Sequence, residues 1–102
     1  MNWPDRIPVG AITIPVEVVD ESFPGNTDKG EFAHENLPEP AIFVRSGLEE
    51  DFEDFVICHE IAHAWLYATG LGDLLSLEHE EEEVFCQIVG QQLIMLLREM
   101  PD

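Results

Sequence analysis

The segment of residues 58–65, which reads CHEIAHAW, constrains this chain more than any other. It contains two histidines four residues apart, with a glutamate directly after the first, which is the pattern H-E-x-x-H. On a helix spanning residues 47–69, His59 and His63 lie one turn apart on the same face, where both imidazoles can bind one metal ion. Glu60 is rotated by roughly 100° and can reach the edge of the same cleft without being a ligand. The alternative is an amphipathic helix with a pair of core histidines.

Composition limits the classes of partner. The 102 residues suit one domain, residues 1–102, and 45% hydrophobic content favours a folded globule over a disordered acidic tail. Acidic residues number 22 and basic residues four, which gives a net charge of −18. Such a surface repels nucleic-acid phosphates and anionic membranes, so we expect no nucleic-acid or membrane binding. It would tolerate a basic peptide or protein.

The chain is expected to be cytoplasmic and to use its cysteines for packing. No basic-then-apolar leader opens it, and no apolar run approaches the ~18 residues that a membrane span needs. Two cysteines, Cys58 and Cys86, are too few for a disulfide scaffold, and both fall in apolar helical patterns. We expect both to be buried.

The first half of the chain predicts strands. Residues 7–20 are rich in β-branched side chains and are interrupted at Gly10, which favours a hairpin. Pro8 and Pro15 cannot donate to a ladder, which places the hairpin at a sheet edge or at bulges. Residues 20–40 are expected to be a long loop, with a possible short strand at residues 30–34, and this loop could line a substrate cleft. A strand follows at residues 40–44.

The second half predicts two helices. Ser46 and Glu49 match a capping box, so the first helix should begin at about residue 47, and Gly70 with Gly72 should end it. Because it is apolar on two faces, we expect it to lie between a sheet and a second helix. That second helix should run from about residue 80 to 100, before Pro101. Its predicted apolar face comprises Leu75, Phe85, Ile88, Val89, Leu93, Leu96, Leu97 and Met100.

A catalytic zinc ion needs a third protein ligand, and a glutamate of the second helix could supply it. The longer metzincin motif is absent, because Leu66 and Thr69 stand where it needs glycine and histidine. Glu82 lies near the centre of the predicted apolar face, which slightly favours it on the helical wheel. Glu83 lies on the flank where Cys86 and Gly90 would let another helix approach closely. The helical wheel therefore leaves both Glu82 and Glu83 as candidates for the third ligand.

Residues 40–97 resemble H-E-x-x-H zinc peptidases of the gluzincin kind. They resemble more closely the compact ImmA/IrrE-type metallopeptidases and the small peptidase-like proteins of phages and mobile elements. The segment of residues 83–90 can be laid on the Glu-x-x-Ala-Asn-x-Phe-Ala motif that carries the third ligand in that family. Glu83 takes the ligand position, and Gln87 stands where the family has Asn or Asp, so an amide would have to hold the zinc-binding histidine. The two motifs also look like the peptidase domain of plant LIM-containing growth-regulating peptidases.

The resemblance implies a Zn²⁺ ion held by His59, His63 and Glu83, with Glu60 as the general base in peptide hydrolysis. Tyr67 is the best candidate for stabilising the oxyanion, whereas His34 and His79 are expected to be surface residues.

The expected fold is α+β: a small, largely antiparallel sheet from residues 7–45 packed on the first helix, with the second helix bringing Glu83 to the metal. One alternative is a zinc-stabilised or metal-free interaction module with little activity. Another is a regulatory protease that meets its target through a partner chain.

Overall fold

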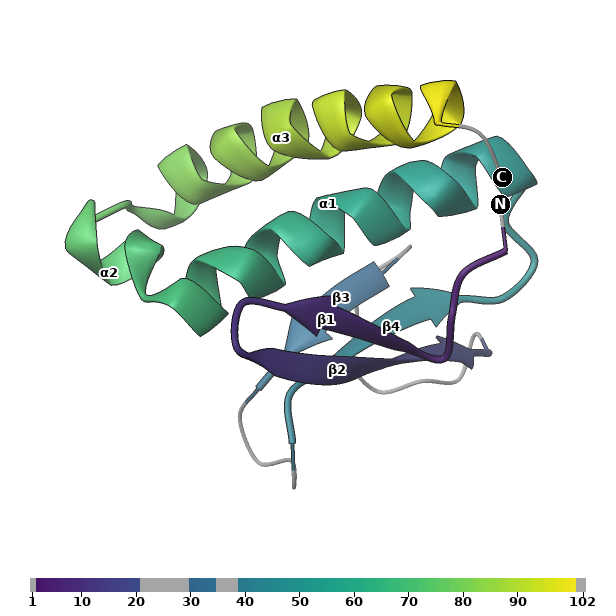
Figure 1. The fold of residues 1–102 in the computed structure, drawn as a ribbon, viewed down its shortest axis with the longest axis horizontal. Coiled ribbons are helices and arrows are strands. Elements are labelled where there is room, and N and C mark those ends of the chain that lie inside the picture. The colour runs from purple at the N-terminus through teal and green to yellow at the C-terminus, as the bar shows by residue number, and fades with distance from the viewer. Residues whose placement is uncertain (1, 21–29, 35–38, 101–102) are drawn as a thin grey trace.

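The computed structural model describes residues 2–20, 30–34 and 39–100 and confirms the α+β class. The strands are β1 (Arg6–Val9), β2 (Ile12–Val19), β3 (Gly30–Ala33) and β4 (Ala41–Arg45), and the helices are α1 (Glu50–Thr69), α2 (Leu71–Leu74) and α3 (His79–Glu99). Helix α1 lies between the sheet and α3 (Figure 1). Among the described residues, none of these helices combines the length and apolar character that a membrane span requires.

The sheet is mixed, with the strand order β1-β2-β4-β3. The predicted hairpin is present: β1 pairs antiparallel with β2, and Gly10 between them has a φ of 59°, which glycine adopts without strain. Strands β3 and β4 also pair antiparallel, but β2 and β4 run parallel. The sheet is therefore largely antiparallel, as predicted, with one parallel pairing at its centre.

The two prolines of the hairpin occupy different kinds of position. Pro8 lies in β1, an edge strand, as predicted. Pro15 lies in β2, the inner strand of the hairpin, so the hairpin is at the sheet edge as predicted but Pro15 is not in the edge strand itself. However, β2 pairs with β1 up to Pro15 and with β4 from Val16 onward. The missing N–H of Pro15 thus falls where the strand changes partners.

Helix α1 buries two sides, as its sequence predicted. Towards the sheet, Val56, Ile57 and Ala64 pack against buried residues of β1, β2 and β4. Towards α3, Ala62 and Leu66 pack against Cys86. Both cysteines are buried, free and 0% exposed. The helix that carries the histidines is therefore held from both layers.

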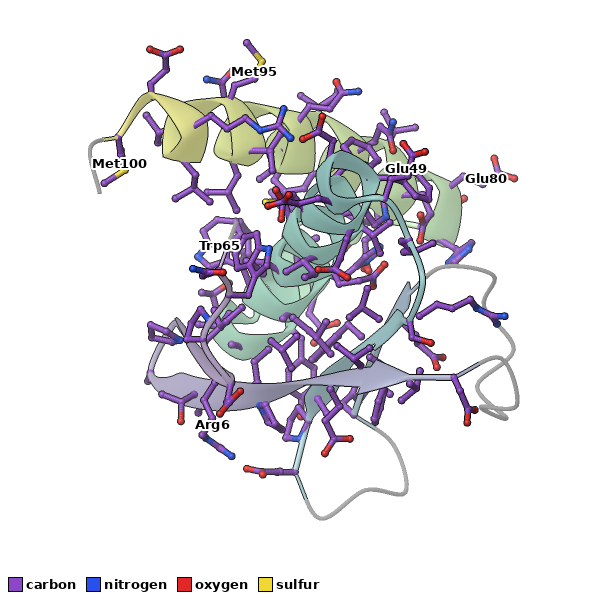
Figure 2. The ribbon with its side chains drawn as sticks, turned by 90° about the vertical axis from the view of Figure 1, so that its right-hand side faces the viewer. Arg6, Glu49, Trp65, Glu80, Met95 and Met100 are labelled. Atoms are coloured by element: carbon purple, nitrogen blue, oxygen red, sulfur yellow. The ribbon has the colours of Figure 1, made fainter. Side chains whose placement is uncertain are left out.

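The predicted capping box at the start of α1 is wrong. The backbone N–H of Ser46 donates to the carbonyl of Val19 at 2.7 Å, so this residue extends the pairing of β4 with β2 instead of capping a helix. Gly47 then turns the chain with a φ of 84°. Helix α1 begins at Glu50, directly after Glu49 (Figure 2). Glu49 is the N-cap residue and makes no side-chain capping bond.

The remaining helix ends are partly as predicted. Gly70, with a φ of 72°, ends α1, whereas Gly72 lies inside α2, a short helix that was not predicted. Helix α3 has the capping box, in which Glu78 and Glu81 each accept a bond from the backbone of the other. Pro101, which was expected to follow the end of α3, lies outside the described residues. So does most of the predicted long loop, at residues 21–29 and 35–38. The possible strand near residue 30 is present as β3.

The predicted apolar face of α3 is wrong in four positions, because Leu75, Ile88, Leu96 and Met100 are exposed. Its buried residues are Cys86, Gly90 and Ile94, whereas Ile88 is 61% and Leu96 is 56% exposed. Met95 points away from α1 (Figure 2). The true contact face is centred on small residues, so α3 approaches α1 more closely than a leucine-lined face would permit.

Gly90 lies where the two helices are in close contact. A Cβ atom added there would stand 3.0 Å from both the backbone nitrogen and the Cα of His59, and 3.3 Å from the carbonyl carbon of Cys58. These are backbone atoms in the middle of α1, which cannot move aside as the tip of a flexible side chain can. The absence of a side chain at Gly90 therefore fixes the separation of α1 and α3 beside the first histidine.

We expect Gly90→Ala to lower the free energy of unfolding by roughly 1–2 kcal/mol, because an overpacking cost at the upper end of roughly 1–3 kcal/mol outweighs the ~1 kcal/mol that alanine gains over glycine in a helix. Gly72→Ala is the control, since its Cβ would meet Leu66 at an ordinary 3.7 Å. Urea unfolding followed by circular dichroism measures both. A Gly90→Ala protein as stable as the wild type would show that the helices are not in close contact there.

Candidate metal centre

Helices α1 and α3 bring three potential ligand groups together. The Nε2 atoms of His59 and His63 lie 3.2 Å apart. The two carboxylate oxygens of Glu83 lie 3.2 Å from His59 Nε2 and 3.1 Å from His63 Nε2. Both imidazoles are largely buried, whereas the Glu83 side chain is 45% exposed. The three groups therefore form a cluster that opens to solvent on the glutamate side.

The spacing of these atoms suits a metal ion. Zinc binds nitrogen and oxygen ligands at roughly 2.0–2.1 Å, so adjacent ligands of a tetrahedral site lie about 3.3–3.4 Å apart. The Nε2 atoms of His59 and His63 lie 3.2 Å apart, close to that edge length, and each lies 3.1 or 3.2 Å from a different oxygen of Glu83. Two imidazole nitrogens and one carboxylate also form a common donor set for catalytic zinc, with a fourth position left open. The residues present therefore fit a zinc ion.

Glu82 fixes the orientation of His63. Its carboxylate accepts a hydrogen bond from the Nδ1–H of His63 at 2.6 Å, which leaves Nε2 as the nitrogen with a free lone pair. The family resemblance assigns such a role to Gln87. That residue is exposed and has no hydrogen bond to either histidine within the part of the chain that the structure describes.

Two adjacent glutamates on α3 thus contact the histidines in different ways. Glu83 faces both Nε2 atoms, and Glu82 holds the far side of one ring. The sequence signal for this arrangement is the flank formed by Cys86 and Gly90, on which Glu83 lies. The sequence does not reveal the role of Glu82, because a helical wheel shows direction around one helix but not the ring atoms of another.

The buried setting of His59 favours a neutral ring. Burial, followed by the proximity of His63, holds the pKa of His59 below its ordinary value, although Glu83 acts in the opposite direction. A neutral imidazole is the form that binds a metal. Both the lowered pKa of His59 and the position of its Nε2 atom are therefore compatible with metal binding.

Glu60 lies next to the cluster and is held by the sheet. The backbone N–H of Phe32, in β3, donates to Glu60 Oε1 at 2.8 Å. Burial raises the pKa of Glu60 to about 7, with His63 and the Phe32 bond acting in the opposite direction. A carboxyl group in this range can accept and release a proton near neutral pH.

A single cavity of about 690 Å³ joins these groups. Besides the histidines and glutamates named above, it is lined by residues of β3, α1, α2 and the start of α3. Tyr67, which the sequence suggests as a functional residue, is among them. His34 and His79 are exposed, as expected, and both line the cavity. For His34 this agrees with the expectation that the loop of residues 20–40 could line a cleft, whereas no place in the cavity was expected for His79.

A second cluster overlaps the first. His63, Glu82 and Cys86 also bring one ligand atom each within 4.8 Å of one another. Burial, followed by the charges of Glu82 and Glu83, raises the pKa of the Cys86 thiol to about 12. Because the thiolate is the form that binds metal, this second set is the poorer site.

Comparison with known proteins adds no assignment. No protein-family model, no curated protein and no solved structure matches this chain.

We expect Glu82→Ala to weaken zinc binding by roughly 10- to 100-fold, because the ring of His63 would lose the partner that sets its tautomer and orientation. Glu80→Ala is the matched control, since it removes an exposed carboxylate from the same helix (Figure 2). Competition with a zinc-binding dye measures both affinities. Equal affinity in the two variants would contradict an orienting role for Glu82.

Proposed function

We propose that this protein is a zinc-dependent metallopeptidase that hydrolyses peptide bonds. The observation that carries the proposal is the convergence of His59 Nε2, His63 Nε2 and the Glu83 carboxylate at separations of 3.1 and 3.2 Å. Glu60 lines the same cavity and supplies a base beside the site. A purely structural zinc site has no need of a base, so Glu60 favours catalysis over a structural role.

The chain's own residues would divide the work as follows. His59, His63 and Glu83 hold the ion, which when bound supplies a Lewis acid that polarises the substrate carbonyl and acidifies water. Glu60 accepts a proton from the water that attacks the carbonyl carbon. As the carbon–nitrogen bond breaks, Glu60 delivers this proton to the leaving amine. The Phe32 N–H keeps the Glu60 carboxylate in place between these steps.

The charge of the cavity supports a basic peptide or protein as the substrate. Glu31 and Asp73 line it in addition to the glutamates already assigned, and no lysine or arginine does so within the described residues. A cationic side chain near the scissile bond would therefore be attracted and a carboxylate repelled. The two free cysteines are compatible with a reducing compartment, so we propose that the protein acts in the cytoplasm.

The test combines metal content with peptide cleavage. Purified wild-type protein should hold about one zinc ion per chain by elemental analysis, and His63→Ala and Glu83→Ala proteins should hold none. Zinc-loaded wild-type protein should generate new termini in a library of lysine-rich peptides analysed by mass spectrometry. Glu60→Gln should keep the zinc and lower the cleavage rate by at least roughly 100-fold, because it removes the base.

Glu80→Gln controls for the loss of one negative charge and should cleave like the wild type. If the wild-type and Glu60→Gln proteins both hold zinc and neither cleaves a peptide, the enzymatic proposal would be contradicted. That result would favour a zinc-stabilised interaction module. A chain that binds no zinc would contradict both, and the histidines would then belong to the contact between α1 and α3.

A further inference from the structure

An aromatic pair forms part of the cavity wall beside the proposed zinc site. The ring of Tyr67, near the end of α1, stacks on the ring of His34, directly after β3, with centroids 4.4 Å apart and an interplanar angle of 24°. The ring of Phe32 lies 5.5 Å from that of Tyr67 and 5.7 Å from that of His34. All three residues line the same cavity as the proposed ligands.

Phe32 ties this aromatic pair to the proposed base. Its backbone N–H donates to Glu60 at 2.8 Å, while its side chain packs against the pair. Tyr67 follows His63 by one helical turn on α1, so the two side chains lie on nearly the same face. A strand and a helix therefore fix the pair in relation to both the base and a proposed ligand.

Within the part of the chain that the structure describes, the polar atoms of the pair are available to a substrate. Tyr67 is 47% exposed to solvent. Within residues 2–20, 30–34 and 39–100, neither its hydroxyl group nor a ring nitrogen of His34 has a hydrogen-bond partner. No lysine or arginine of the described residues lines the cavity. A stacked ring also has little rotamer freedom left to lose on binding.

We propose that Tyr67 donates a hydrogen bond to the carbonyl oxygen of the substrate peptide and that His34 positions the Tyr67 ring by stacking. This inference rests on the proposed peptidase function. When water adds to the carbonyl carbon, the electron pair of the C=O double bond moves to the oxygen. The Tyr67 hydroxyl stabilises that charge while keeping its own proton. Tyr67 is then a catalytic residue, and His34 is a positioning residue.

The first measurement does not depend on activity. The chain contains one tyrosine, so protein labelled with ¹³C at tyrosine Cζ gives a single NMR signal from Tyr67. The probe is a lysine-containing phosphinic pseudopeptide, whose anionic oxygen stands in for the oxyanion. Adding it to the zinc-loaded protein should shift the Tyr67 signal. Tyr67→Phe should weaken its binding by roughly 10- to 100-fold, as expected for a hydrogen bond to a charged group.

The matched control is Trp65→Phe, which alters another partly exposed aromatic residue of α1 that does not line the cavity. It should leave binding of the phosphinic peptide unchanged. In peptide hydrolysis, Tyr67→Phe should lower kcat by roughly 10²- to 10³-fold with little change in KM. His34→Ala should lower kcat by up to roughly 100-fold through misplacement of the tyrosine, and His34→Phe, which keeps a stacking ring, should restore it.

The outcomes separate this inference from the proposed function. An unshifted Tyr67 signal, together with unchanged affinity of Tyr67→Phe for the phosphinic peptide, would overturn the role of the pair and leave the zinc site standing. A His34→Phe protein as impaired as His34→Ala would overturn positioning by stacking. A wild-type chain that binds neither zinc nor the phosphinic peptide would overturn the peptidase proposal and this inference with it.

Discussion

The close approach of α3 to α1 is the constraint on which the candidate metal centre depends. Gly90 and the buried Cys86 present almost no side-chain bulk towards α1, and a Cβ at Gly90 would stand only 3.0 Å from the backbone of His59. Two turns before Gly90, the same face of α3 carries Glu83. The short carboxylate therefore reaches the histidines, whereas a wider helix separation would leave it in solvent. Packing between two small residues and a helix backbone thus determines whether three ligands can meet.

The same approach concentrates negative charge. Glu60, Glu82 and Glu83 surround two histidines in a chain whose net charge is already −18. Like charges at such short range oppose folding, and burial raises the pKa of Glu60 to about 7. A divalent cation would offset this repulsion. The arrangement is therefore costly as a purely structural feature and well suited to holding a metal ion, which is why we regard it as a functional site.

Local signals in the sequence predicted much of the fold. The hairpin around Gly10, the end of α1 at Gly70 and the burial of Cys58 and Cys86 all follow from residue type and periodicity. The incorrect predictions concern positions whose structure depends on a residue far away in the sequence. Ser46 bonds to Val19 of another strand and so does not cap a helix, and the parallel pairing of β2 with β4 joins segments far apart in the sequence. At the site, the histidine spacing indicated one shared face, but the contact of Glu82 with His63 Nδ1 depends on the packing of α3.

The most direct test of the central claim is zinc K-edge X-ray absorption spectroscopy of the zinc-loaded protein. A site built from His59, His63 and Glu83 predicts nitrogen and oxygen scatterers at roughly 2.0–2.1 Å, with the multiple-scattering pattern of two imidazoles and no sulfur. A sulfur scatterer at roughly 2.3 Å would place Cys86 on the metal, in the overlapping cluster with His63 and Glu82. That result, or a spectrum of fully hydrated zinc, would contradict a zinc site formed by the two histidines and Glu83.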